Sequence, residues 1–282
     1  MNFHRAPNTY VDQVNLYVKN TERSKDFYSG VLGLSVLREA KNMVTFSANG
    51  SDPLITVEQP VDVLPQIRRS AGLYHFALLV PTRKDLAAVT AHLMKEEYPL
   101  VGGADHAVSE ALYLEDPDGN GIEIYRDRPS EEWEWENGRV FMPTEAMDEH
   151  LLDELEGEPW SGLSKETIMG HLHLQVANLK ETEQFYLDGL GFNLVAAYGP
   201  YADFISTGGY HHHIGLNVWN SRGVPVQEGT HVGLNYYRLV FPGDQVRAEV
   251  IERITKLGAS IDKVGDRLFT KDPSGIKFEL AV

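Results

Sequence analysis

The amino-acid sequence predicts an α+β protein that consists of two similar domains, and three observations support this prediction. First, a strand pattern followed by a helix pattern near the N-terminus recurs in the second half of the chain. Second, a strand–turn–strand motif that ends the first half also ends the second. Third, a further strand and helix precede each of these turns, so each half contains two strand–helix–strand units. Internal duplication on this scale indicates two related α+β domains.

The first repeat joins the segments 14–34 and 172–192, which read VNLYVKNTERSKDFYSGVLGL and LHLQVANLKETEQFYLDGLGF. Both copies begin with apolar residues at alternate positions, which is typical of a strand, and continue with a helical pattern. We expect the helices to begin near Thr21 and Leu179. Each should end at a Leu-Gly pair, where the glycine suits a helix C-cap.

The second repeat joins the segments 113–125 and 268–280, which read YLEDPDGNGIEIY and LFTKDPSGIKFEL. Both contain an Asp-Pro-x-Gly turn between two strand patterns. Aligning the turns places Glu123 opposite Glu279. Between the halves, residues 130–162 are acidic and interrupted by prolines, so we expect a connector with one short helix.

Composition excludes several classes of protein and site. The chain has 282 residues and a formal net charge of −16, which argues against nucleic acid or an anionic membrane as a partner. It contains no cysteine, which excludes disulfides, thiolate zinc sites and a cysteine nucleophile. The N-terminus has no apolar signal core, and no apolar run reaches membrane-spanning length. We therefore expect a cytoplasmic protein.

Three consecutive histidines precede a strand pattern in GGYHHHIGLNVW, residues 208–219. If the alternation extends through the run, His211, His213 and Asn217 share a polar face, whereas His212 lies on the apolar face that packs into the core. His213 should then point into a site and His212 away from it. Taken alone, this stretch is compatible both with solvated histidines and with metal ligands.

The motifs HLHLQV, FYLDGLGF and DPSGIKFEL resemble those of the vicinal oxygen chelate superfamily, which includes glyoxalase I, bleomycin-resistance proteins and extradiol ring-cleaving dioxygenases. With LYHFALL, GNGIEIYRDRP and GGYHHHIGLN in this order, the chain is most similar to bacterial catechol-2,3-dioxygenase-type proteins. The resemblance implies four βαβββ modules that form two cup-shaped domains. The expected division is a two-module domain at 1–128, an acidic connector at 129–165 and a second two-module domain at 166–282.

In this superfamily the metal ligands come from the first strand and a late strand of a module, and the resemblance implies a site in the C-terminal cup. His171 falls on the first-strand position and Glu279 on the late-strand position, and His211 is expected to supply a second imidazole. Two imidazoles and one carboxylate suit non-haem Fe(II), with Mn(II), Ni(II) or Zn(II) as alternatives. The chain departs from the family at Tyr236, where ring-cleaving relatives carry a histidine.

The resemblance also implies roles around that metal. His213 is the expected acid–base catalyst, although its position also suits a ligand, and Tyr236 is expected to orient the oxyanion. The side chains expected to contact the substrate are Arg238, His173 and Asn217.

The N-terminal cup is the alternative metal site. Gln13, His75 and Glu123 fall on family ligand positions and together resemble a glyoxalase-I-like site. In two-domain dioxygenases the N-terminal cup is usually vestigial, and the competing interpretation of His75 is a histidine that is hydrogen-bonded under the sheet. We therefore expect the C-terminal cup to hold the metal.

The function implied by the resemblance is extradiol cleavage of a catechol-like aromatic diol with O₂. One alternative is a glyoxalase-like metal-dependent lyase or isomerase, which needs no open position for O₂. Another is a resistance-type protein that binds a small aromatic molecule without turnover. The expected partners are a small aromatic substrate and O₂, with no nucleic acid and no membrane. Whether the chain forms a homo-oligomer is left open.

Overall fold

The computed structural model describes residues 2–157 and 159–282, and it contains four modules of one strand, one helix and three strands. Module 1 comprises β1 (Tyr10–Tyr17), α1 (Thr21–Lys25) with the π-helical turn η1 (Asp26–Val31), β2 (Ser35–Ala40), β3 (Met43–Ser47) and β4 (Ile55–Glu58). Module 2 comprises β5 (Gly72–Leu79), α2 (Arg83–Lys95), β6 (Leu100–Asp105), β7 (Ser109–Glu115) and β8 (Gly121–Asp127).

The second half repeats this order. Module 3 comprises β12 (Ile168–Gln175), α3 (Leu179–Gln184) with the π-helical turn η4 (Phe185–Leu190), β13 (Asn193–Ala197), β14 (Ala202–Ser206) and β15 (Ile214–Asn217). Module 4 comprises β16 (Gly233–Val240), α4 (Asp244–Lys256), β17 (Asp262–Val264), β18 (Arg267–Lys271) and β19 (Lys277–Ala281). The segment between the halves carries the 3₁₀ turn η2 (Ser130–Glu132), the short strands β9 (Trp135–Glu136), β10 (Arg139–Val140) and β11 (Glu145–Ala146), and the 3₁₀ turn η3 (Leu151–Glu154).

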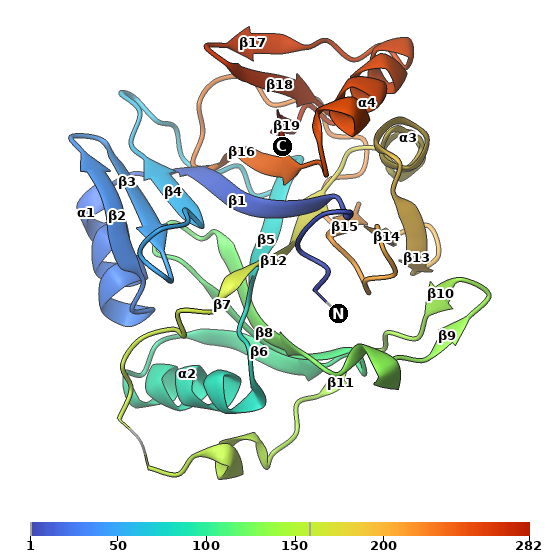
Figure 1. The fold of residues 1–282 in the computed structure, drawn as a ribbon. Coiled ribbons are helices and arrows are strands. Elements are labelled where there is room, and N and C mark those ends of the chain that lie inside the picture. The colour runs from blue at the N-terminus through green and yellow to red at the C-terminus, as the bar shows by residue number, and fades with distance from the viewer. Residues whose placement is uncertain (1, 158) are drawn as a thin grey trace.

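The modules pair across the two halves of the chain. One sheet has eight strands in the order β17-β18-β19-β16-β1-β4-β3-β2, and the other has nine in the order β11-β6-β7-β8-β5-β12-β15-β14-β13. Module 4 thus joins module 1 through antiparallel β16 and β1, and module 2 joins module 3 through antiparallel β5 and β12 (Figure 1). Two curled sheets of similar topology confirm the predicted α+β fold with two cups. However, neither cup is formed by one half of the sequence, because the first strands of modules from opposite halves meet edge to edge.

Local signals set the ends of the first helix in modules 1 and 3. The side chains of Asn20 and Asn178 accept hydrogen bonds from the backbone N–H groups three residues later, which caps the start of α1 and α3. Gly191 ends the second helical segment in a left-handed conformation with φ of 87°. Gly33 has a φ of 72°, and a Cβ there would lie 2.3 Å from the backbone of Gly162. The predicted helix starts and glycine ends are therefore confirmed.

The two repeated motifs of the sequence contact each other. The hydroxyl of Tyr28, from the first motif, donates to Asp116 of the Asp-Pro-x-Gly turn at 2.9 Å. Tyr186 donates to Asp272 of the second turn at 3.4 Å. The same aspartates accept backbone N–H groups of their own turns. Each tyrosine therefore connects the helix of one module to the turn of the next, and this contact links the two modules of each half.

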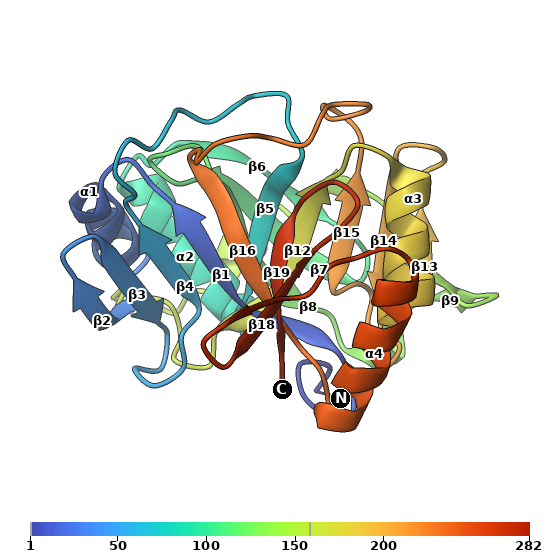
Figure 2. The ribbon, with the colours of Figure 1, turned by 90° about the horizontal axis from the view of Figure 1, so that it is seen from above.

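One apolar core runs through all four modules, and β1 lies against β12 where the two sheets meet. Figure 2 shows α3 and α4 together at one side of the molecule and α1 and α2 at the other. None of the helices in the described residues is long and apolar enough to cross a membrane.

Candidate metal centre

Three neighbouring strands bring two imidazoles and one carboxylate together. β5, β8 and β12 are adjacent in the nine-stranded sheet, and alternate residues of each strand face its concave side. In the strand register, Ala77 lies between Glu123 of β8 and His171 of β12. His75 lies two residues before Ala77 on the same face. Because Ala77 carries only a methyl group, the longer side chains around it converge.

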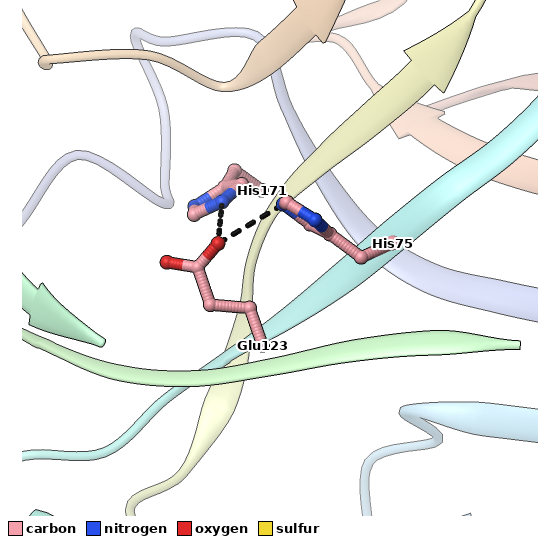
Figure 3. Close-up of side chains that lie close together, drawn as sticks. All are labelled: His75, Glu123 and His171. Carbon is pink, nitrogen blue, oxygen red and sulfur yellow. Dashed lines mark hydrogen bonds and ion pairs between the residues drawn. The ribbon is translucent and has the colours of Figure 1, made fainter. Parts of the chain in front are cut away.

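The three longer side chains point toward one another (Figure 3). Oε2 of Glu123 is 3.0 Å from Nε2 of His75 and 3.2 Å from Nε2 of His171. One ligand atom from each residue lies within 4.8 Å of the other two. The side chains of His75, Glu123 and His171 are 9%, 4% and 1% exposed. We call these residues the three-residue centre.

The charge of this centre favours a cation. Burial lowers the pKa of His171, so its imidazole is neutral near pH 7. Burial opposes ionisation of Glu123, but the adjacent His171 and His75 outweigh it and hold the pKa of that carboxyl well below its usual value. A buried, ionised carboxylate beside two imidazole rings is an arrangement that favours a bound cation.

Hydrogen bonds within the protein do not satisfy this centre either. Nε2 of His75 is buried and has no hydrogen-bond partner among the described residues, although it lies 3.0 Å from the Glu123 carboxylate. A divalent cation held by the three atoms would give this nitrogen a partner and would neutralise the carboxylate. Two imidazoles and one carboxylate form a donor set that non-haem Fe(II) and Zn(II) both accept. The residues therefore fit a metal ion.

A cavity of about 510 Å³ lies over the centre, with His75 and Glu123 in its wall. Most of the remaining wall is aromatic or imidazole. This part of the wall includes His106, Tyr113, His173, Phe204, His212 and Trp219. The size and the mainly apolar lining suit a small aromatic molecule.

Tyr113 and His106 form a hydrogen-bonded pair in the cavity wall. Tyr113 faces Glu123 across β7 and β8, and its hydroxyl is 2.8 Å from Nε2 of His106. Nδ1 of His106 lies 2.7 Å from the carbonyl of Pro143, and because a carbonyl only accepts, Nδ1 carries the hydrogen. Burial and the charge of Glu123 raise the pKa of Tyr113 well above its usual value. The phenol therefore stays protonated and can donate a hydrogen bond.

The structure does not assemble the metal trio expected in the C-terminal half. His171 belongs to the three-residue centre. His211 does not, because its Nε2 lies 2.8 Å from Oδ1 of Asp127. Glu279 lies in the other sheet, where its Oε2 is 2.5 Å from the guanidinium of Arg267. The expectation is wrong because module 3 pairs with module 2 and not with module 4.

The eight-stranded sheet has equivalent positions that carry different residues. The counterparts of His171, His75 and Glu123 in the strand register are Gln13, Tyr236 and Glu279. Arg238 takes the place of Ala77, and its Nε lies 3.9 Å from Glu279. A guanidinium thus provides positive charge beside the carboxylate of this sheet. Within the described part of the chain, the three-residue centre is the only group of three or more His and acidic donors close enough to hold a metal.

The alternative trio from the N-terminal half is also split. His75 and Glu123 belong to the three-residue centre, whereas Gln13 lies in the other sheet and donates a hydrogen bond to Thr56 at 2.9 Å. The centre therefore draws two residues from the first half of the chain and one from the second.

The histidine run lies before its strand. β15 begins one residue after His213, and the chain turns at Gly208 and Gly209, which have φ of 65° and 75°. These left-handed conformations favour glycine. The strand alternation therefore does not extend back through the three histidines.

As a result, the directions of His212 and His213 are opposite to those expected. His212 lines the cavity, and its ring centroid is 4.0 Å from that of His171. His213 points toward the N-terminal segment, where Nε2 lies 3.2 Å from the carbonyl of Phe3. The prediction that His213 faces the site and His212 faces away is therefore wrong.

Of the other residues expected to act on the substrate, only His173 borders the cavity, and its buried Nε2 has no partner among the described residues. Asn217 is buried and accepts a hydrogen bond from a backbone N–H at 3.1 Å. Tyr236 and Arg238 lie in the other sheet, where Arg238 is ion-paired with Asp12. Tyr236 and Arg238 are separated from His173 because module 4 pairs with module 1, whereas module 3 pairs with module 2.

The sequence patterns do not single out Tyr113 or Asp127 as site residues. A signal for Tyr113 was present, because it and Glu123 flank the same Asp-Pro-x-Gly turn and pair in a hairpin register. For Asp127 the sequence offers no comparable signal, since its contact with His211 depends on the loop before β15.

Comparison with known proteins identifies relatives of the chain. Residues 10–124 and 168–280 match the family described as the Glyoxalase/Bleomycin resistance protein/Dioxygenase superfamily. The chain is 43% identical over 269 residues to catechol-2,3-dioxygenase of Bacillus subtilis (strain 168), which covers 94% of both chains.

Solved structures share the fold at lower sequence identity. A putative dioxygenase from Bacillus subtilis subsp. subtilis str. 168 superposes with a TM-score of 0.67 and 17% identity, over 96% of this chain and 84% of that chain. Glyoxalase I from Zea mays gives a TM-score of 0.59 and 14% identity, over 96% of this chain and 91% of that chain. At these identities the likeness concerns the fold alone.

Proposed function

Because the chain belongs to the glyoxalase/bleomycin resistance protein/dioxygenase superfamily, we propose that it is a metal-dependent extradiol dioxygenase that opens the ring of a catechol-like diol with O₂. The observation that carries the proposal is the three-residue centre at the base of an aromatic-lined cavity. The 43% identity to a catechol-2,3-dioxygenase supports the reaction class.

His75, Glu123 and His171 would hold the metal, which we propose to be Fe(II). When bound, Fe(II) provides a site at which the diol oxygens and O₂ can be brought together and activated. Because the protein would supply only three donor atoms, coordination positions would remain for the diol and for O₂.

The cavity wall would bind and orient the aromatic ring. The rings of Trp219 and Phe204 both pack against His173, with centroids 5.2 Å and 5.4 Å from that of the imidazole, and all three line the cavity. Such aromatic surfaces suit contact with a flat aromatic substrate. Nε2 of His173 is buried and lacks a partner among the described residues, so a substrate hydroxyl that reached it would give it one.

Two residues can handle protons at the substrate. Burial lowers the pKa of His212 well below its usual value, so its imidazole is neutral at pH 7 and can accept the proton of a diol hydroxyl. Tyr113 remains a protonated phenol, and if its hydrogen turns from Nε2 of His106 toward the cavity, it can donate to an oxygen that becomes negative. A base and a hydrogen-bond donor on the same cavity suit the conversion of a diol to its anion before ring opening.

The test is anaerobic loading with Fe(II), followed by O₂ and a series of catechols. We expect consumption of one O₂ per diol and the absorbance of a ring-opened product, with no uptake before iron is added. Metal retention without O₂ uptake would instead favour a glyoxalase-like lyase or isomerase. Tight binding of an aromatic molecule by a protein that retains no metal would favour a resistance-type binding protein.

A further inference from the structure

A chain of hydrogen bonds leads from the cavity wall to a carboxylate behind it. His212 lines the cavity, and its Nδ1 is 2.8 Å from Nδ1 of His211. Nε2 of His211 is in turn 2.8 Å from Oδ1 of Asp127, the last residue of β8. His211 is fully buried and His212 is 6% exposed, so water competes little for these bonds.

Asp127 sets the direction of these hydrogen bonds. Because a carboxylate only accepts, Nε2 of His211 must donate to it. When His211 holds a single ring hydrogen, that hydrogen is on Nε2, so Nδ1 of His211 accepts and Nδ1 of His212 must donate to it. Nε2 of His212 then carries a lone pair, and it is the ring nitrogen that remains for a molecule in the cavity.

Neighbouring aromatic residues hold Asp127 and His211 in this arrangement. The hydroxyl of Tyr210 donates to the same Oδ1 of Asp127 at 3.2 Å, and it also lies 2.7 Å from the hydroxyl of Tyr125. The ring of Trp133 packs edge-on against His211 at a centroid distance of 5.1 Å. Two donors therefore converge on the carboxylate, which keeps it an acceptor.

We propose that Asp127 and His211 are positioning residues that hold His212 in the tautomer with hydrogen on Nδ1, so that the basic Nε2 faces the substrate. The role of His212 as a base in catalysis rests on the proposed function. The tautomer of His212 does not depend on that function.

In the proposed reaction, the O–H bond of a diol hydroxyl breaks, and its proton forms an N–H bond with Nε2 of His212. The electron pair stays on the diol oxygen. The resulting imidazolium keeps its hydrogen bond to His211, and the carboxylate of Asp127 stabilises the positive charge through that ring without taking a proton, as in a triad of carboxylate, imidazole and nucleophile.

Asp127→Leu tests the proposal because leucine has a similar shape and cannot accept a hydrogen bond. Hydrogen on Nε2 of His211 would then lose its acceptor, so the ring favours hydrogen on Nδ1, which donates to His212 and moves the hydrogen of His212 to Nε2. ¹⁵N NMR of the metal-free protein distinguishes the two tautomers, with the His212 signals assigned by their loss in His212→Gln. We expect hydrogen on Nδ1 of His212 in the wild type and on Nε2 in Asp127→Leu. Tyr210→Phe is the matched control, since it removes the neighbouring hydroxyl, keeps the carboxylate and should leave the tautomer unchanged.

Activity of the iron-loaded proteins gives an independent readout. In Asp127→Leu we expect kcat to fall roughly 10²-fold, the size of a general-base contribution, while KM and bound iron stay close to wild type. Hydrogen on Nε2 of His212 in the wild type, or an unchanged tautomer in Asp127→Leu, would overturn the proposal. If the tautomers are as expected but neither protein consumes O₂ with any diol, the proposed function fails and the assignment of the tautomer stands.

Discussion

Replacing Glu123 by glutamine removes the negative charge of the three-residue centre and nearly preserves its shape. In the metal-free protein we expect a small change in stability. The variant loses the charge-assisted hydrogen bond between Glu123 and His171, at 3.2 Å, which is worth about 1.5–3 kcal/mol. It also avoids the cost of burying the charge of Glu123, and this gain offsets a similar amount of free energy. Metal binding should respond strongly. Removing a partner of a ligand already weakens binding about 10–100-fold, so removing a charged ligand should weaken it by at least about 100-fold.

The assay is the rise in thermal midpoint when Fe(II) is added anaerobically. Metal at about 100 times its Kd stabilises the wild type by about 2.7 kcal/mol. For 282 residues, an unfolding entropy of about 2.1 cal/mol/K per residue converts this to about 5 °C. At the same metal concentration Glu123→Gln would gain only about 0.4 kcal/mol, which is less than about 1 °C.

Glu279→Gln is the matched control for this experiment. Glu279 occupies the equivalent position in the other sheet, and its partner Arg267 is 45% exposed. Glu279 itself is only 9% exposed, but the glutamine amide keeps an oxygen that can accept from Arg267, so this variant should fold and show the full thermal shift. A full shift in Glu123→Gln, or its loss in Glu279→Gln, would refute the assignment of the centre.

Three further predictions follow from other contacts. His212→Gln should lower kcat roughly 10²-fold with iron retained, whereas His213→Gln should keep most activity; steady-state kinetics with the reverse result would contradict the observed side-chain directions. Tyr28→Phe should lower the free energy of unfolding by about 1–3 kcal/mol, because it removes the buried donor to Asp116; urea denaturation measures this, and an unchanged midpoint would count against the contact. Burial lowers the pKa of His4 to about 4, so the folded state disfavours its protonation and stability falls as pH drops below about 6.5. Because His4 is only partly buried, the wild type should lose about 1–2 kcal/mol more than His4→Gln between pH 7 and 5, and parallel denaturation curves would contradict this.

The sequence predicted most of the local structure because each signal acts over a few residues. Caps such as Asn20 and glycine ends such as Gly191 set the helix limits, and the Asp-Pro-x-Gly turns are stabilised by their own aspartates. The pairing of the modules could not be predicted in the same way. The first strands β1, β5, β12 and β16 all offer an edge for antiparallel pairing, and the repeat does not indicate which edges meet.

The candidate site was predicted in part for the same reason. His75, Glu123 and His171 were all recognised as ligand positions, but they were assigned to two different sites. One distinguishing signal was in the sequence: Ala77, two residues after His75, leaves room for a metal, whereas Arg238 fills the equivalent place in the other sheet. The directions of the histidine run were not predictable, because the start of a strand after a glycine turn decides them.

The proposed metal centre draws two residues from module 2 and one residue from module 3. An anomalous difference map from crystals loaded with Fe(II) without oxygen, measured at the iron edge, would locate the ion. We predict one peak bonded to Nε2 of His75, the carboxylate of Glu123 and Nε2 of His171. A peak beside Gln13 and Glu279 in the eight-stranded sheet, or no peak at the three-residue centre in fully loaded protein, would contradict this prediction.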